Sequence, residues 1–270
     1  IGPMTGTVHD NALLLNVIAG ADGIDMRQEN HCANNYVDTL EEGIDGMKIG
    51  VVKEGFGHVG CEPDVDAKVL KAIDVLAKLG ADLREISIPM HLQCGAIWGG
   101  IGPEAFAVDM VFAKGATTGL KGLYVPSLLK HLANWPARAN RLDAGVKVDI
   151  LLGIFLHENH RGRYYGKAQN LRRKVEHDYE YALTTCDLLV MPTHSRKAPP
   201  YPRADAPKVA QPKLSTPGAV NTWAANLTGH PAMSAPCGMS EGLPIGLMLM
   251  AADYDEATIY RAAHAYEQEV

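Results

Sequence analysis

The feature that most restricts the fold is a strand, a helix and a second strand that follow one another in the first third of the chain. Residues 47–52 form a short apolar run, typical of a strand. Pro63 then opens a stretch with helical spacing, because its apolar residues stand at positions 65, 69, 73, 76 and 79. A second strand-like run, 83–88, stops before Pro89. Two strands joined by one helix pair in parallel, so the sequence predicts an α/β fold.

The rest of the chain alternates between expected helices and a few short strands. Helices are expected at 8–19, 92–114, 124–134, 138–157, 162–184, 218–226 and 256–268. The first of these is so dense in apolar residues that we expect it to be mostly buried. Strands are expected at 186–191, 233–236 and 245–250, the last two as a hairpin. A proline-rich loop spans 194–218, and no boundary divides the chain into separate domains.

Charge, hydropathy and cysteine usage narrow the class of protein. The 25 Lys and Arg against 31 Asp and Glu give a net charge of −6, which argues against nucleic-acid binding. No apolar run reaches the roughly 18 residues that a membrane helix needs. The five cysteines are scattered, odd in number and without a C-x-x-C pair. We therefore expect reduced thiols and a cytoplasmic protein.

Several residues that could carry chemistry lack the pattern that the chemistry needs. Ser234 is not surrounded by the G-x-S-x-G elbow of a hydrolase nucleophile, and Cys186 begins an apolar strand, as a core residue does. His157 and His160 are three residues apart rather than the four of a zinc H-E-x-x-H motif, and no third ligand can be assigned. The glycines of 95–100 do not match a phosphate-binding loop. We predict no metal and no cofactor.

Glycines and prolines near the end of the chain carry the most specific pattern. Residues 226–238, followed by 242–247, resemble the carboxy-terminal block of the amidase signature family, N-x-T-G-x-P-x-x-S-x-P-x-G and then G-L-P-x-G. Residues 2–15 resemble its G-P-M segment, and 187–193 resemble its D-x-L-x-x-P-T strand. The nitrile-pathway amidases of that family are resembled in residues 165–171, in Arg27 with Gln28, and in 54–58.

This resemblance implies a mixed β-sheet flanked by helices, and amide hydrolysis by a Ser-cisSer-Lys mechanism that uses no cofactor. In the family the three catalytic residues lie upstream of the G-P-M block, and this chain begins at that block. We therefore expect residues 1–270 to be the carboxy-terminal part of one amidase domain, without a catalytic residue of its own. The 270-residue chain alone would then hydrolyse no amide. The alternatives are a non-catalytic fragment, a subunit of an amidotransferase-like assembly, or a second chain that carries the triad.

The resemblance also implies which residues face the substrate, a small-molecule amide. The candidates are Trp98, Thr193, Pro217, Val220 and Trp223. An apolar, aromatic lining is typical of small-molecule pockets, although both tryptophans would serve equally well as core aromatics. The candidate partners are the missing amino-terminal half and a second copy in a homodimer. The sequence departs from the family at Gly6, where an Arg is usual, and residues 99–160 resemble no particular branch.

Overall fold

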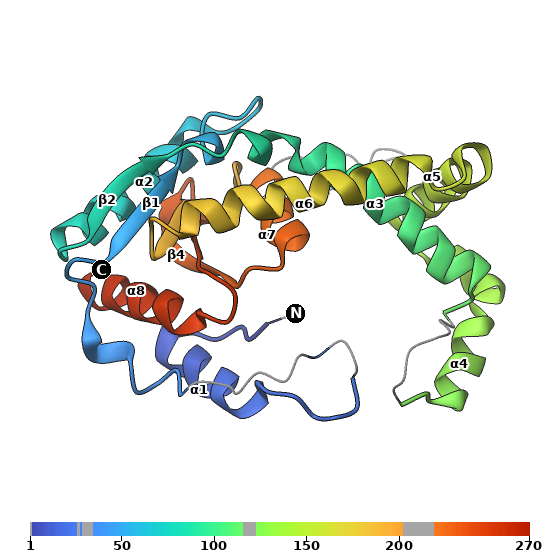
Figure 1. The fold of residues 1–270 in the computed structure, drawn as a ribbon, viewed down its shortest axis with the longest axis horizontal. Coiled ribbons are helices and arrows are strands. Elements are labelled where there is room, and N and C mark those ends of the chain that lie inside the picture. Colours follow the sequence, from blue (N-terminus) through green and yellow to red (C-terminus); the bar gives the residue numbers. More distant parts are fainter. Residues whose placement is uncertain (1, 26–27, 29–34, 116–122, 202–218) are drawn as a thin grey trace.

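The computed structural model describes residues 2–25, 28, 35–115, 123–201 and 219–270. Its helices are α1 (Val8–Ile18), α2 (Pro63–Lys78), α3 (Cys94–Ala107), α4 (Pro126–Ala133), α5 (Ala144–His160), α6 (Arg163–Leu183), α7 (Val220–Thr228) and α8 (Glu256–Glu269). Its strands are β1 (Lys48–Val52), β2 (Asp82–Ile86), β3 (Leu188–Pro192), β4 (Ala232–Ser240) and β5 (Leu243–Met250). In Figure 1, α4 and α5 lie far from β1 and β2, at the opposite end of the molecule.

These strands form one mixed sheet in the order β2-β1-β3-β5-β4. The predicted strand-helix-strand unit is confirmed, because β1 pairs in parallel with β2 from Lys48 opposite Asp82 onward. Strand β1 also pairs in parallel with β3, whereas β5 is antiparallel to both β3 and β4. The expected mixed β-sheet flanked by helices is therefore confirmed, and the expected hairpin forms as β4 and β5, with its turn at Glu241 and Gly242.

The central strand β3 is buried on both faces and supplies two separate cores. Leu188 and Val190 contribute to the core beneath α2 and α8, whereas Leu189 and Met191 contribute to the core beneath α3, α6 and α7. Such alternation follows from the two-residue period of a strand. The short apolar run 186–191 thus contains a fully buried strand, as expected.

The first helix differs from its prediction. Its amino-terminal cap is as expected, since the Thr7 hydroxyl accepts a hydrogen bond from the Asp10 amide at 3.1 Å. However, α1 buries only Val8 and Ala12, while other apolar side chains on it are exposed, with Val17 at 77%. The expectation of a mostly buried helix is therefore wrong for this structure. Apolar density indicates that a surface is suited to burial, but it does not supply the neighbour that would cover it.

The region between β2 and α6 is helical, as predicted, but its boundaries shift. The expected helix 92–114 is instead a 3₁₀ turn at Pro89–Gln93, then α3, then a π-helical turn at Val108–Phe112. Pro103 stands inside α3 and cannot donate a backbone hydrogen bond there. Within the described ranges, every helix is too short or too polar to cross a membrane.

Candidate substrate-binding site

Thr193 lies at the end of β3, where the chain leaves the sheet. Its amide donates to the Gly246 carbonyl at 2.9 Å, and its Oγ1 lies 2.7 Å from Ser234 Oγ on β4. The two hydroxyls meet across β5, above Gly246. A Cβ atom at position 246 would come to 2.9 Å from Thr193 Oγ1 and closer still to Ser234 Oγ. The glycine of the G-L-P-x-G block therefore has a local reason, because it leaves room for this hydroxyl pair.

Helix α7 begins with Val220 and is fastened to the sheet by the next residue, Asn221. This side chain is fully buried, and its Nδ2 donates to the carbonyls of Gly55 at 3.0 Å and Pro192 at 2.6 Å. Its Oδ1 lies 2.9 Å from His91 Nε2. One amide thus satisfies two backbone acceptors, one just after β1 and one at the end of β3, and contacts two ring nitrogens, because Oδ1 also lies 3.0 Å from His58 Nε2. Asn221 therefore fixes the start of α7 relative to the end of β3.

His91 extends this network to the helices that carry the rest of the site. It lies in the 3₁₀ turn just before α3, and its Nδ1 is 2.6 Å from the Tyr179 hydroxyl on α6. Because Asn221 Oδ1 can only accept, we assign the ring proton to Nε2, so that Nδ1 accepts from Tyr179. Burial lowers the pKa of His91 to about 4, so the ring is neutral near pH 7. The network joins α3, α6 and α7 without a buried charge.

Trp98 and Trp223 stand on the two helices that this network aligns. Both are partly buried and pack against the core beneath α3, α6 and α7. Gly95 on α3 lets the Trp223 ring approach, since a Cβ there would lie 2.8 Å from Cε3. Gly102, one helical turn beyond Trp98, would place a Cβ 3.4 Å from the indole Nε1. Trp98 thus lies on α3, and Trp223 on α7 packs against α3 at Gly95. Thr193 lies at the end of β3, and Pro217 lies outside the described residues.

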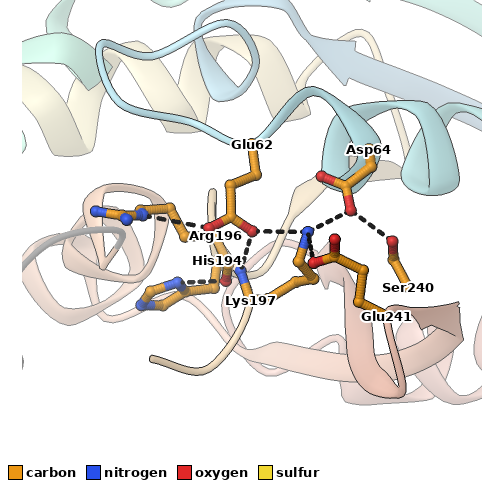
Figure 2. A network of polar contacts seen from close by, with 7 residues as sticks. All are labelled: Glu62, Asp64, His194, Arg196, Lys197, Ser240 and Glu241. Atoms are coloured by element: carbon orange, nitrogen blue, oxygen red, sulfur yellow. Dashed lines mark hydrogen bonds and ion pairs between the residues drawn. The ribbon is translucent and has the colours of Figure 1, made fainter. Parts of the chain in front are cut away.

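A second polar network holds the loop that follows β3. Figure 2 shows Lys197 between the carboxylates of Glu62, Asp64 and Glu241, with Nζ 3.0 Å from Glu62 and 3.3 Å from Glu241. The hydrogen bond to Asp64, and then that to Glu62, raises the pKa of Lys197 above its ordinary value. The hydrogen bond from Lys197, with a second from Ser240, lowers the pKa of Asp64 to about 2. Lys197 therefore stays charged and anchors the loop, and it is not suited to act as a base.

Other candidate groups are poorly suited to catalysis or metal binding. Burial raises the pKa of the Cys94 thiol to about 12 and that of Cys237 to about 11, which suppresses the reactive thiolate. His157 contacts Glu104, whereas the ring of His160 packs against Tyr164, so the two histidines do not converge. Over the described ranges, His, Cys, Asp and Glu form no group of three that could hold a metal ion.

Reasoning from the sequence missed Asn221 and His91, the residues that position the site. Each is a single polar residue with no periodic pattern around it, and their separation of 130 residues hides the contact between them. The one available signal is a polar Asn between the two apolar candidates Val220 and Trp223. An amide at that place in a helix start is compatible with a buried hydrogen-bonding role, but it does not identify the partner.

Comparison with known proteins agrees with this architecture. A family model described as Amidase matches residues 1–260, and the chain belongs to that family of amidase signature enzymes. It is 36% identical over 276 residues to an enantioselective amidase of Rhodococcus rhodochrous, covering 100% of this chain and 53% of that protein. It is 35% identical over 269 residues to one subunit of the glutamyl-tRNA(Gln) amidotransferase of Geobacillus thermodenitrificans, covering 99% and 54%.

Solved structures show the same fold. The crystal structure of the corresponding glutamyl-tRNA(Gln) amidotransferase subunit from Thermotoga maritima matches with a TM-score of 0.72 at 26% identity, over 99% of this chain and 52% of that one. A bacterial aryl acylamidase of the amidase signature family matches with a TM-score of 0.73 at 20% identity, over 99% and 52%. The chain therefore spans about half the length of the relatives that it matches. The resemblance found in the sequence is confirmed.

Proposed function

We propose that this chain is the substrate-facing part of an amide hydrolase that converts an amide and water into a carboxylic acid and ammonia. Residues 1–270 would form the second part of one amidase domain in the cytoplasm, where the scattered thiols stay reduced. The observation that carries the proposal is the pair Trp98 and Trp223, partly buried on two helices that Asn221 and His91 align. Partly buried aromatic side chains suit the acyl group of a small amide, and we call the surface proposed for Trp98 and Trp223 the tryptophan wall.

The catalytic serine, the cis-peptide serine and the lysine of the proposed mechanism would come from an amino-terminal half. In that mechanism the lysine takes a proton through the bridging serine, the nucleophilic serine attacks the amide carbonyl, and ammonia leaves before water releases the acid. The residues of this chain would bind and orient the acyl group. Lys197 and the buried thiols are poor substitutes for the missing groups, because their pKa values are all raised.

The amino-terminal half would also cover apolar surface that this chain leaves exposed. Leu13 and Leu14 on α1 are 50% and 40% exposed, and Val17 and Ile18 lie on the same helix with larger exposed fractions. Such a surface on an isolated chain favours aggregation and binding of hydrophobic dyes. We expect the 270-residue chain alone to bind such a dye strongly, and the complete protein to bind it weakly. A monomeric chain with a sharp melt and no dye binding would contradict this arrangement.

The activity is tested by measuring ammonia release from benzamide and propionamide. The protein that carries this chain together with its amino-terminal half should release ammonia above a heat-killed control, and the 270-residue chain alone should release none. Intact mass measurement excludes contamination of the short chain by the longer one. Failure of the complete protein to hydrolyse either amide would favour a non-catalytic remnant over an amidase.

The tryptophan wall is tested separately by Trp98→Ala in the complete protein. Loss of apolar contact with a ring-sized acyl group should cost about 1–3 kcal/mol, or about 10–200-fold in kcat/KM for benzamide, and should spare propionamide. Trp135→Ala, outside the proposed site in the short helix Trp135–Arg141, is the matched control and should leave the ratio of the two substrates unchanged. Equal losses for both amides, with about 3–5 kcal/mol of lost stability, would assign Trp98 to the core.

A second candidate function is that of one component in an amidotransferase-like assembly. It is favoured by the relative from Geobacillus thermodenitrificans, which is 35% identical to this chain and is named as part of an amidotransferase. The two functions differ in what the complete protein needs. An amidase should hydrolyse small amides without another protein, alone or as a homodimer, whereas an amidotransferase component should become fully active only with its partner subunits.

A further inference from the structure

A pocket of about 350 Å³ lies where α3, α5 and α6 meet. We call it the Glu104 pocket, and its main lining residues are Glu104, Val108, Asp109, His157, Arg161 and Tyr165. Its volume falls at the lower end of the range for small-molecule sites, roughly 300–1,000 Å³. The tryptophan wall does not include these residues, and the inference drawn from them does not rest on the proposed amide hydrolysis.

Glu104 is the unusual member of this pocket. The residue is only 2% exposed, and its Oε1 lies 3.2 Å from His157 Nδ1. Its other oxygen, Oε2, is buried and has no hydrogen-bond partner among the described residues. A buried carboxylate with an unpaired oxygen is costly, because neither water nor a donor replaces its lost hydration. Glu104, which lines the pocket, therefore has a carboxylate oxygen without a donor in the described part of the chain.

The backbone around Glu104 packs closely beside the pocket. Gly153 of α5 lies against the Pro103 carbonyl so closely that no Cβ would fit, which brings α5 onto α3 beside Glu104. Arg161 and Gly162 then turn the chain into α6 with left-handed φ values of 50° and 76°. A Cβ at position 162 would lie 3.8 Å from Glu104 Oε1, so the tight turn borders the carboxylate. These close contacts bring α3, α5 and the start of α6 together around Glu104.

We propose that the Glu104 pocket binds the primary ammonium group of a small organic amine. An ammonium offers three hydrogen-bond donors and a positive charge, which match the unpaired oxygen of Glu104. Asp109 adds a second carboxylate, while Ala105 and Val108 provide apolar lining for a short alkyl chain. Arg161 also lines the pocket, and its positive charge would repel an ammonium group. Because Arg161 is exposed, solvent screens that charge.

The test uses the complete protein and follows binding by NMR shifts or calorimetry, with n-butylammonium as the probe and 1-butanol as its neutral match. We expect saturable binding of n-butylammonium and much weaker binding of 1-butanol. Glu104→Gln keeps the shape of the side chain and removes its charge, so it should weaken n-butylammonium binding about tenfold or more. Glu158→Gln, on the exposed surface of the same α5 end, is the matched control and should bind as the unaltered protein does.

Two results would overturn the proposal. One is that n-butylammonium binds no more tightly than 1-butanol, and the other is that Glu104→Gln binds n-butylammonium as well as Glu158→Gln does. If Glu104→Gln does not fold, Ala105→Leu provides a steric test, because it narrows the pocket and leaves the carboxylate in place. Blocked binding in Ala105→Leu supports the pocket, whereas unchanged binding places the amine elsewhere and refutes it.

Discussion

Gly246→Ala is the sharpest test of how β3, β4 and β5 fit together. The new Cβ would lie 2.9 Å from Thr193 Oγ1 and even closer to Ser234 Oγ, in a strand held by neighbours on both sides. Because β5 cannot move away from one neighbour without pressing on the other, the hydroxyl pair would have to separate. Overpacking of this kind costs about 1–3 kcal/mol, and we expect the free energy of unfolding to fall by that amount.

The cause of the loss can be isolated with a second substitution. Ser234→Ala alone removes one exposed hydrogen bond and should cost about 0.5–1.5 kcal/mol. In the double variant the closest obstructing atom, Ser234 Oγ, is absent, so the combined loss should be smaller than the sum of the two single losses by about 0.5–3 kcal/mol. Urea unfolding of the complete protein, followed by circular dichroism, gives the three free energies, provided that the slope with urea is unchanged.

Gly166→Ala is the matched control for this experiment. Gly166 lies within α6, and no neighbouring atom comes within 4 Å of its added Cβ. The same chemical change should therefore stabilise the protein by about 0.5–1 kcal/mol, since alanine favours a helix over glycine. Strict additivity of Gly246→Ala and Ser234→Ala would refute the proposed steric conflict, as would an unaltered midpoint for Gly246→Ala.

Three further predictions concern the polar networks, all measured on the complete protein by urea unfolding. Asn221→Ala leaves two backbone carbonyls unpaired and should cost about 2–5 kcal/mol, whereas Asn226→Ala on the exposed side of α7 should change stability by about 0.5 kcal/mol or less. The pKa of His91 is lowered from 6.5 to about 4, so its contribution to the free energy of unfolding should be full above pH 6.5 and decline as the pH falls towards 4. His91→Gln should flatten that decline. An equally steep curve for this variant would contradict the prediction. The pKa of Asp64 is lowered from 3.8 to about 2, so its contribution to stability should be present above pH 3.8 and lost as the pH falls through 2. Lys197→Met should make this loss of stability in acid smaller. An unchanged pH dependence for this variant would refute the role given to the Lys197–Asp64 pair.

Local patterns predicted the helices and strands better than they predicted which elements lie next to one another. The strand-helix-strand unit was recognisable because the apolar period changes from that of a strand to that of a helix and back within about forty residues. The helix expected at 92–114 has boundaries that the apolar pattern does not report, since a 3₁₀ turn precedes α3 and a π-helical turn follows it. The exposed apolar face of α1 has a cause outside the helix, because burial requires a neighbouring element and apolar density in the sequence does not report one.

The candidate site was predictable only as a set of residues. The family resemblance supplied Trp98, Thr193, Val220 and Trp223, but the order of strands decides which of them lie close together. Thr193 meets Ser234 because β3 and β4 flank the same strand, and no local sequence signal reports that order. Whether the four residues contact substrate stays a prediction, and Pro217 lies outside the described residues.

The order of the strands also determines when each pair of strands can form during synthesis. The Lys48 amide at the start of β1 donates to Asp187, 139 residues further along the chain. During synthesis at about 5–20 residues per second, β1 would therefore wait roughly 7–28 s before its inner neighbour β3 emerges. In that interval only β2, of the two neighbours that β1 has in the described sheet, is available to it, so the other edge of β1 is open to incorrect pairing. A sheet built from such distant pairings has a high contact order, and we expect it to fold slowly and to depend on chaperones more than a helical bundle of this size.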